Sequence, residues 1–215
     1  VFYGVVNPLF ESPDELMHYP YVQYLASGHG LPVQEPGSDA LWEQEGSQPP
    51  LYYALSAALT FWIDTSDLPQ VRVLNPHARI GVPLAPDNKN VLVHTAREDF
   101  PWRGTVLAVH LLRLFSLILG AGTVWCTYLL AQRVVPKRPE MALGAMAVNA
   151  FLPMFVFISS SVNNDNLIVF LSSVTLLLLV RLVQFDKRGN DMAQLLLLGL
   201  VIGLACLSKL SGLAL

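Results

Sequence analysis

The chain has 215 residues, of which 53% are apolar and only 13% are charged. The charged share is about half that of an average soluble domain, and with a mean hydropathy of +0.47 it argues against a soluble globular enzyme. A net charge of −3 offers no basic surface, so we do not expect nucleic acid as a partner. Cys126 and Cys206 both lie in long apolar runs and predict neither a disulfide framework nor a zinc cluster.

Charge is distributed unevenly along the chain. Residues 1–104 carry 12 acidic and 5 basic side chains, a net charge of −7, whereas residues 105–215 carry 4 acidic and 8 basic side chains, a net charge of +4. The second half is also far more apolar. We therefore expect a large extracytoplasmic loop with short juxtamembrane helices over residues 1–104, followed by a membrane-embedded region over residues 105–215.

The two ends of the sequence resemble cut ends. The first residues, VFYGVV, have neither a methionine nor a cationic flank, so they do not resemble a signal peptide. The last residues lie in an apolar run without a helix stop signal. We expect the chain to be an N-terminal fragment of a larger membrane protein, with its first residues forming the tail of a preceding span.

A short helix is predicted next. Ser12 offers an N-cap, Pro13 suits the first helical position, and the two acids that follow lie in the first turn. The helix is expected to stop at Gly28 and to be interrupted by Pro20.

A second helix is predicted from Gln48 through Trp62. It is shorter than the roughly 20 residues that a span needs, so we expect it to lie at the membrane interface. Tyr52, Tyr53 and Trp62 suit the level of the lipid headgroups. The stretch from Asp64 to Arg103 has no clear periodicity and is expected to be an irregular loop.

Four apolar stretches long enough to cross about 30 Å of hydrocarbon follow in close succession. Because the connectors are short, successive spans must be neighbours that run in opposite directions. The predicted fold class is therefore an all-α integral membrane protein, built as an antiparallel transmembrane helix bundle. The expected spans are Val106–Leu130, Met141–Ser161, Leu167–Phe185 and Ala193–Leu215.

Lys and Arg in the connectors set the expected orientation. One basic connector follows the first span and another follows the third, so both are expected to be cytoplasmic. The same alternation places residues 1–104, the VNNDN connector and Lys209 at the extracytoplasmic face. The basic residues are Arg133, Lys137 and Arg138 in one connector and Arg181, Lys187 and Arg188 around the other.

An acidic cluster marks the start of the first predicted helix. His18 lies four residues after Asp14 and three after Glu15, so an acid and an imidazole share one helical face. Asp14, aided by Glu15, is a candidate general base toward an acceptor hydroxyl, or a ligand of a divalent cation. A solvated cluster of N-capping acids explains the same residues equally simply.

Two further polar segments are candidate binding elements. The Gln48 amide, near Tyr52, can donate and accept hydrogen bonds at once, which suits recognition of hydroxyl groups. Residues 163–166 (NNDN) form a predicted outer turn that contains Asp165, a candidate for binding a polar substrate or, with Asp14, a cation such as Mg or Mn. The alternatives are prolines that only start a helix and Asx residues that only form a turn.

Cations lie at the predicted outer edge of the membrane. His110 and Arg113 are near the start of one span, and Lys209 is near the end of another. A charge costs about 2.5–3.5 kcal/mol at the centre of a span and less near an interface, so it tends to face a cavity or a partner. Arg113 and Lys209 are candidates for binding a lipid-linked phosphate. Snorkelling of these side chains to lipid headgroups is the alternative.

The order of these motifs resembles a known family. The segments NPLFESPDExxH, GSQPPLYY, NPHARIG, FPWRG, an RL-containing span, NNDN and KLSGL follow one another over nearly the whole chain. This order is similar to that of bacterial membrane glycosyltransferases of the GT-C superfamily. The similarity is to the protein mannosyltransferase and aminoarabinose transferase type, glycosyltransferase family 39.

The resemblance implies a multi-span helical enzyme of the bacterial inner (plasma) membrane, with its active site at the outer face. The family's Asp-Glu pair in the first outer loop matches Asp14 and Glu15, and the resemblance implies that the first acid is the base or an acceptor-site carboxylate. An acid in the second outer loop is similar in position to Asp165, and the cations that hold the donor phosphate are matched less closely by Arg113 and Lys209. Some relatives hold a divalent metal at the acidic pair and others do not.

We therefore expect a glycosyltransferase that moves a sugar, with inversion, from a polyprenyl-phosphate-linked donor to a saccharide, lipid or protein acceptor, within membrane lipids. The expectation requires acids from two outer connectors to meet cations at the outer edge of the bundle and to enclose one pocket. A non-catalytic binder or translocator of lipid-linked saccharides is the alternative. The candidate residues are Asp14 and Glu15 for catalysis and His18, Gln48, Tyr52, Asp165, Arg113 and Lys209 for substrate binding.

Overall fold

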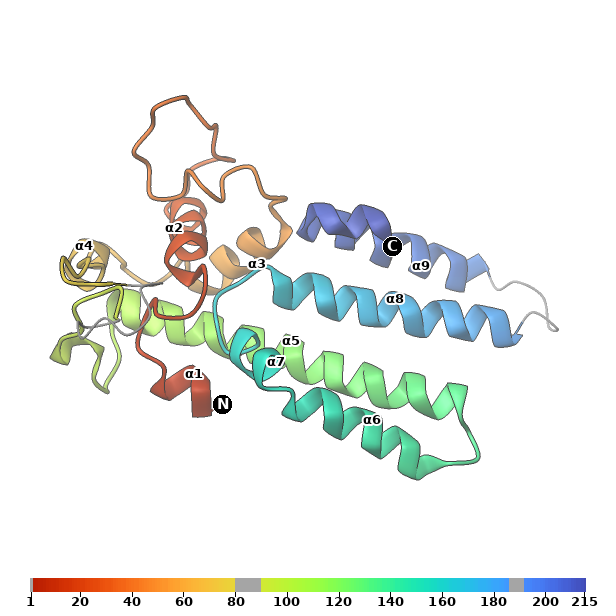
Figure 1. Ribbon diagram of the computed structural model, residues 1–215. Helices are drawn as coiled ribbons and strands as arrows, with labels where there is room; N and C mark the ends of the chain where they lie inside the picture. The colour runs from red at the N-terminus through yellow and green to blue at the C-terminus, as the bar shows by residue number, and fades with distance from the viewer. Residues whose placement is uncertain (1, 80–89, 186–191) are drawn as a thin grey trace. The chain divides into compact units, whose positions relative to one another are not determined.

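A computed structural model describes residues 2–79, 90–185 and 192–215 (Figure 1). In these residues the regular structure is helical, and the β pairing there is a single bridge between Leu74 and Leu92. The predicted all-helical class is therefore confirmed. The chain divides into two compact units, which are Val1–Ser47, Ala54–Phe115 and Ser160–Asn163 for the first, and Gln48–Tyr53, Ser116–Ser159 and Asn164–Leu215 for the second.

The first unit contains short helices joined by long loops. Part of the stretch that was predicted to be irregular, between Asp64 and Arg103, forms two short helices, although residues 80–89 lie outside the described part. The helices of this unit are α1 (Phe2–Val6), α2 (Glu15–Ala26), most of α3 (Leu51–Thr60), α4 (Leu68–Val71), the 3-10 helix η1 (Ala96–Glu98) and the first part of α5 (Gly104–Val134).

The start of α2 differs from its prediction. Asp14, not Ser12, precedes the helix, with φ 61° and ψ −5° in the left-handed region. The main-chain oxygen of Asp14 accepts hydrogen bonds from the N–H groups of Met17 at 2.8 Å and His18 at 2.9 Å. The Ser12 hydroxyl instead accepts a hydrogen bond from the side-chain amide of Asn7 at 2.6 Å. The predicted N-cap at Ser12 is thus wrong, because Ser12 stabilises the preceding loop.

The end of α2 agrees with its prediction, whereas its middle does not. Gly28 has φ +85° and follows the last turn, as expected of a glycine that ends a helix. Pro20 lies inside α2 without interrupting it. The neighbouring residues Tyr19, Tyr21 and Val22 are buried, so tertiary packing compensates for the missing N–H of the proline.

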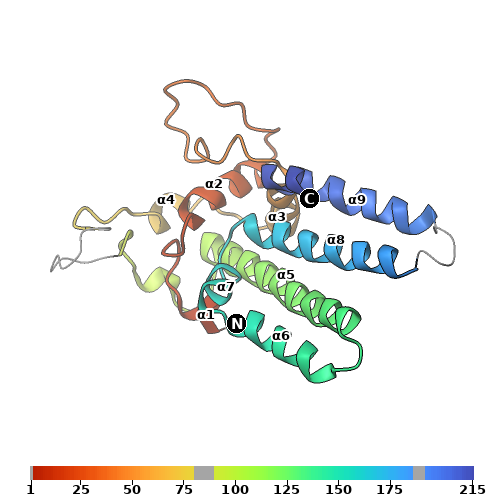
Figure 2. The same ribbon diagram turned by 45° about the vertical axis from the view of Figure 1, so that its right-hand side comes forward.

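The second unit is built from longer helices. It contains the rest of α5, then α6 (Pro139–Phe151), α7 (Pro153–Ile158), α8 (Asp165–Phe185), α9 (Met192–Ser208) and the 3-10 helix η3 (Leu210–Ala214). Within this unit, Figures 1 and 2 show α6, α8, α9 and the Ser116–Val134 part of α5 side by side, with chain-adjacent helices running in opposite directions. The basic connector at 186–191 lies outside the described residues.

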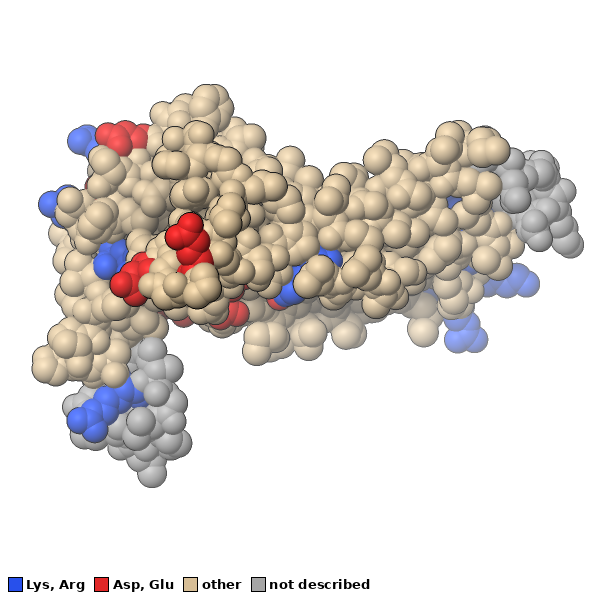
Figure 3. All heavy atoms as spheres, turned by 90° about the horizontal axis from the view of Figure 1, so that it is seen from above, with Lys and Arg blue, Asp and Glu red and all other residues tan. Residues whose placement is uncertain are grey.

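Two helices of the described chain are long and apolar enough to cross a membrane, namely α5 and Asp165–Gln184 of α8. Large apolar side chains on the second unit are exposed, among them Ile118 at 62% and Val183 at 78%. In the face shown in Figure 3, residues other than Lys, Arg, Asp and Glu form most of the surface. A bundle with four spans stays a prediction.

The stretch Met141–Ser161 was expected to be one continuous span but forms two helices. The break is at Leu152, which has φ −66° and ψ 115° and separates α6 from α7. The next residue is Pro153, whose ring disfavours the α conformation of the residue before it. This proline is visible in the sequence, and its effect outweighs the apolar character of the stretch.

The start of α5 depends on an acid from a distant loop. Gly104 has φ +52°, and a Cβ at this position would lie 2.3 Å from Oδ2 of Asp67. The close approach lets Asp67 Oδ1 accept hydrogen bonds from the Thr105 N–H at 2.8 Å and the Thr105 hydroxyl at 2.7 Å. A carboxylate at a helix N-terminus satisfies a free N–H and interacts favourably with the helix dipole.

Replacing Asp67 by Ala is expected to lower the free energy of unfolding by about 0.5–2 kcal/mol, the usual cost of losing an N-cap. Asp67→Asn keeps an acceptor oxygen and should cost less. The measurement is denaturant unfolding of the protein in detergent micelles. Asp39→Ala, at an exposed acid of the same unit, is the control. Equal stability of the Asp67→Ala and Asp39→Ala variants would show that the cap contributes nothing.

Candidate functional site

Asp14 is the exposed member of the Asp-Glu pair. Its carboxylate makes no hydrogen bond or ion pair with the described part of the chain. Non-glycine residues with positive φ are uncommon and often mark functional sites. In the described residues these are Asp14 and Phe10, and both lie close to Glu15 in the sequence. Asp14 therefore combines a carboxylate that has no partner in the described residues with a main-chain conformation that is uncommon for its residue type.

Glu15 is the buried member of the pair, with no exposed surface. Its Oε1 accepts hydrogen bonds from Arg113 Nε at 2.9 Å and from the Val162 N–H at 2.9 Å. Its Oε2 accepts from Arg113 Nη2 at 2.6 Å and from the Phe10 N–H at 2.9 Å. Four donors thus surround the carboxylate, so its acceptor positions are used within the first unit.

The Arg113 side chain is also fully hydrogen-bonded within the first unit. Besides its two bonds to Glu15, it donates to the main-chain oxygens of Gly4 at 3.2 Å, Asn7 at 2.6 Å and Pro8 at 2.9 Å. A guanidinium has five N–H bonds, and all five are used here. The structure therefore leaves Arg113 no free N–H for a donor phosphate, contrary to its predicted role. Glu15 and Arg113 hold the loop that carries Asp14.

His18 lies in the first turn of α2 and is also buried. Its Nδ1 is 3.6 Å from Oε2 of Glu45, and both side chains are less than one tenth exposed. The contact joins α2 to the loop at residues 43–47. The predicted role of His18 in substrate binding is not supported by this position, because the ring faces a protein carboxylate rather than a surface.

The second unit brings one predicted acid and one predicted cation together. Lys209 Nζ donates to Asp165 Oδ1 at 2.5 Å, and their side chains are 30% and 42% exposed. Tyr52 of the same unit is buried, with its hydroxyl 3.2 Å from the Ser116 hydroxyl. Gln48 is half-buried and its amide has no hydrogen bond to the described residues. A partly exposed pair adds about 0–1 kcal/mol of stability.

Asn164, next to Asp165, is a polar residue that the sequence analysis did not single out. Its side chain is fully buried, and neither amide atom has a partner in the described residues. The Ser208 hydroxyl, next to Lys209, is also buried without a partner there. An unsatisfied buried polar group costs about 1–3 kcal/mol and calls for an explanation. The asparagine run signalled a turn, so burial of one amide could not be predicted.

The single pocket that the sequence predicts stays a prediction. Asp14, Glu15 and Arg113 belong to the first unit, whereas Asp165 and Lys209 belong to the second. Among residues 2–79, 90–185 and 192–215, no group of three His, Cys, Asp or Glu side chains is arranged to hold a metal ion. A divalent cation at Asp14 and Asp165 would thus need ligands from both units, and it also stays a prediction.

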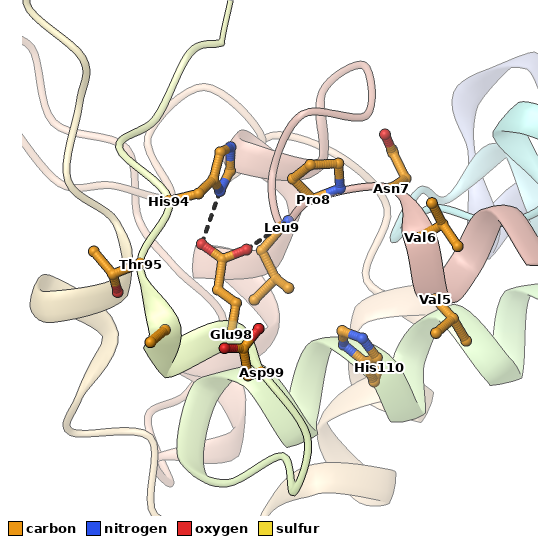
Figure 4. A pocket seen from close by; sticks show the side chains of 11 residues that line it. Val5, Val6, Asn7, Pro8, Leu9, His94, Thr95, Glu98, Asp99 and His110 are labelled. Atoms are coloured by element: carbon orange, nitrogen blue, oxygen red, sulfur yellow. Dashed lines mark hydrogen bonds and ion pairs between the residues drawn. The ribbon is translucent and has the colours of Figure 1, made fainter.

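The first unit contains a cavity of about 410 Å³ (Figure 4). It is lined by residues from the end of α1, the segment Asn7–Leu9, residues 94–96, 98 and 99, and His110. Glu98 lies between two donors, accepting from His94 Nδ1 at 2.7 Å and from the Leu9 N–H at 3.3 Å. Sequence reasoning missed His94 and Glu98, which lie in a stretch without periodicity.

Glu11 connects the same two segments. It accepts hydrogen bonds from the N–H groups of Val91 and Leu92, both at 3.0 Å, and from His94 Nε2 at 3.0 Å. Burial lowers the pKa of His94, but hydrogen bonds and charge from Glu98 and Glu11 raise it by more, so the net pKa is raised. The imidazolium thus holds the loop before α2 against residues 91–98.

This contact should weaken as pH rises. The raised folded-state pKa means that the stabilisation is complete below the unfolded pKa of about 6.5 and is lost as pH passes the folded pKa. We expect stability and the hydrogen-exchange protection of the Val91 and Leu92 N–H groups to fall over that range. His94→Gln should remove the pH dependence, and His29→Gln, at an exposed histidine, should not. The same pH profile in both variants would contradict the assignment.

Residues 104–215, slightly more than half of the chain, match the dolichyl-phosphate-mannose-protein mannosyltransferase family. The chain belongs to this family. The match runs from α5 to the end of the chain and includes Arg113, Asp165 and Lys209, whereas Asp14 and Glu15 precede it. No curated protein and no solved structure matches the chain. The predicted resemblance to a membrane glycosyltransferase of the GT-C type is thus confirmed, and the family uses a lipid-linked sugar donor.

Proposed function

We propose that this member of the mannosyltransferase family transfers a sugar, with inversion, from a polyprenyl-phosphate-linked donor to a saccharide, lipid or protein acceptor. The reaction is placed at the extracytoplasmic face of a bacterial inner membrane, which residues 105–215 cross in four spans. Family membership supports glycosyl transfer in general. The exposed apolar side chains of the second unit and the acidic composition of residues 1–104 support this placement.

The observation that carries the proposed mechanism is the state of Asp14. It is an exposed carboxylate without a partner in the described residues. The loop before it is held by hydrogen bonds of its main chain to Glu15 and Arg113. In an inverting transfer the acceptor oxygen attacks the anomeric carbon as the lipid phosphate leaves from the opposite side. Asp14 is the base that takes the proton from this oxygen.

Glu15 and Arg113 have a positioning role in this proposal. Each is fully hydrogen-bonded inside the first unit, and together they fix the main chain at Asn7, Pro8 and Phe10. A rigid loop keeps the Asp14 carboxylate in one place, which is what general base catalysis requires. This role replaces the phosphate contact that the sequence led us to expect of Arg113.

Lys209 is the cation that we propose for the donor phosphate. Its ammonium group has three N–H bonds, and Asp165 accepts one of them. The other two are available to phosphate oxygens, which an ammonium stabilises as negative charge develops. The buried Asn164 amide and Ser208 hydroxyl adjoin this pair in the sequence and supply further polar groups to the donor. Gln48 and Tyr52 of the same unit complete the proposed donor site.

The test is sugar transfer by the protein that carries this sequence, reconstituted in liposomes with a polyprenyl-phosphate sugar. Asp14→Asn should lower the rate of product formation by about 10²–10⁴ while donor binding, measured with radiolabelled lipid, persists. A product whose anomeric configuration is opposite to that of the donor supports inversion. Lipid binding without product in the unaltered protein would instead favour a non-catalytic binder or translocator.

A further inference from the structure

A second cleft in the first unit is not used by the proposed reaction. It has a volume of about 280 Å³ and lies between the C-terminal half of α2 and the segment Ala40–Trp42. Small-molecule sites usually start at roughly 300 Å³. Among the described residues its lining contains Tyr24, His29 and Trp42 but no Asp, Glu, Lys or Arg. The cleft therefore suits a small ligand without a formal charge.

The aromatic side chains of this cleft form one cluster. The ring centroids of Tyr24 and Trp42 are 5.0 Å apart with planes at 50°, and those of Tyr24 and His29 are 4.5 Å apart with planes at 17°. Gly46 lies against the indole, since a Cβ there would be 3.0 Å from Cε3 of Trp42. The Trp42 ring is thus close to both Tyr24 and Gly46. A ring held in place loses little entropy when it binds a ligand.

The same residues carry polar atoms that the fold does not use. The indole N–H of Trp42 and the hydroxyl of Tyr24 have no hydrogen bond to the described residues. His29 donates its Nδ1–H to the Tyr24 main-chain oxygen at 3.2 Å, so Nε2 of the neutral ring is an acceptor. A donor, an acceptor and a hydroxyl that is both therefore border an aromatic surface.

We propose that this cleft binds a neutral saccharide. A pyranose ring has an apolar face of C–H groups, which packs on an aromatic ring, and a rim of hydroxyls that donate and accept hydrogen bonds. The cluster of Tyr24, His29 and Trp42 offers both surfaces, and the absence of charged residues from the described lining excludes selection by charge. The lining does not include Asp14, so saccharide binding here does not depend on the proposed transfer.

The experiment is isothermal titration of the protein with mannotriose, in a detergent without a sugar headgroup that would compete for the cleft. We expect a Kd of about 1 mM or tighter. Trp42→Ala should weaken binding about tenfold or more, as expected for loss of a tryptophan anchor. Trp62→Ala is the matched control, because Trp62 is 61% exposed and lies outside the cleft. It should bind like the unaltered protein.

Two milder variants keep the proposal testable if Trp42→Ala does not fold. Trp42→Phe retains an aromatic face and should bind within a few-fold of the unaltered protein. Gly46→Ala keeps the indole but requires it to shift by a few tenths of an ångström, so it should weaken binding. The proposal is overturned if Trp42→Ala or Gly46→Ala binds mannotriose as tightly as Trp62→Ala does. It is also overturned if neither mannotriose nor chitotriose binds the unaltered protein at about 10 mM.

Discussion

Replacing Arg113 by methionine is expected to destabilise the first unit by about 3–5 kcal/mol, because it leaves the buried Glu15 carboxylate without its counterion. This loss is large against the total stability of roughly 5–15 kcal/mol of most domains. The substitution also removes the N–H groups that bind the main-chain oxygens of Gly4, Asn7 and Pro8. Unfolding of the purified protein in detergent, followed by near-ultraviolet circular dichroism, measures the effect.

Two comparisons test this structural role. Lys209→Met removes a partly exposed cation and should cost no more than about 1 kcal/mol. The double variant Glu15→Gln with Arg113→Met should be more stable than Arg113→Met alone, because no buried charge remains. If Arg113→Met unfolds at the same denaturant concentration as Lys209→Met, the buried pair does not hold the loop.

Replacing Asp14 by asparagine is expected to lower the rate of sugar transfer by about 10²–10⁴, the usual contribution of a general base. The substitution suits this position because asparagine tolerates the left-handed backbone that Asp14 adopts, with φ 61°. The main-chain oxygen that accepts from Met17 and His18 is also kept. Stability should therefore change little, and the loss of rate can be assigned to the carboxylate.

The readout is single-turnover transfer at a saturating concentration of polyprenyl-phosphate sugar. Asp39→Asn, at an exposed acid of the same unit, is the matched control and should transfer at the unaltered rate. Asp14→Glu keeps the charge but moves it by one methylene, so its rate should fall between those of the two asparagine variants. Transfer by Asp14→Asn at the control rate would show that another group is the base.

The helices of the second unit were largely predictable because their signal is local. A run of apolar residues bounded by polar connectors predicted α5 and α8, and the glycine after α2 was correctly interpreted as a stop. The break at Leu152 has an equally local cause in Pro153, which the prediction of one continuous span did not take into account. Local signals fail at Ser12. Its hydroxyl accepts a hydrogen bond from Asn7 in the preceding loop and does not cap the helix.

The partners of the candidate site residues were harder to predict. The sequence singled out Glu15 and Arg113, and it singled out Asp165 and Lys209, but it did not predict which acid meets which cation. These contacts join residues 98 and 44 positions apart. Whether a guanidinium faces a ligand or a carboxylate depends on such long-range packing. His94, which joins Glu11 across 83 positions, carried no periodic signal at all.

The hydrogen bonds of Glu15 also constrain the order of assembly. Its carboxylate needs Arg113, 98 residues later, and the N–H of Val162, 147 residues later. During synthesis, therefore, the carboxylate of Glu15 cannot complete its hydrogen bonds until α5, α6 and α7 have been made. A nascent chain halted before Val162 would leave one of the four donors to the Glu15 carboxylate missing.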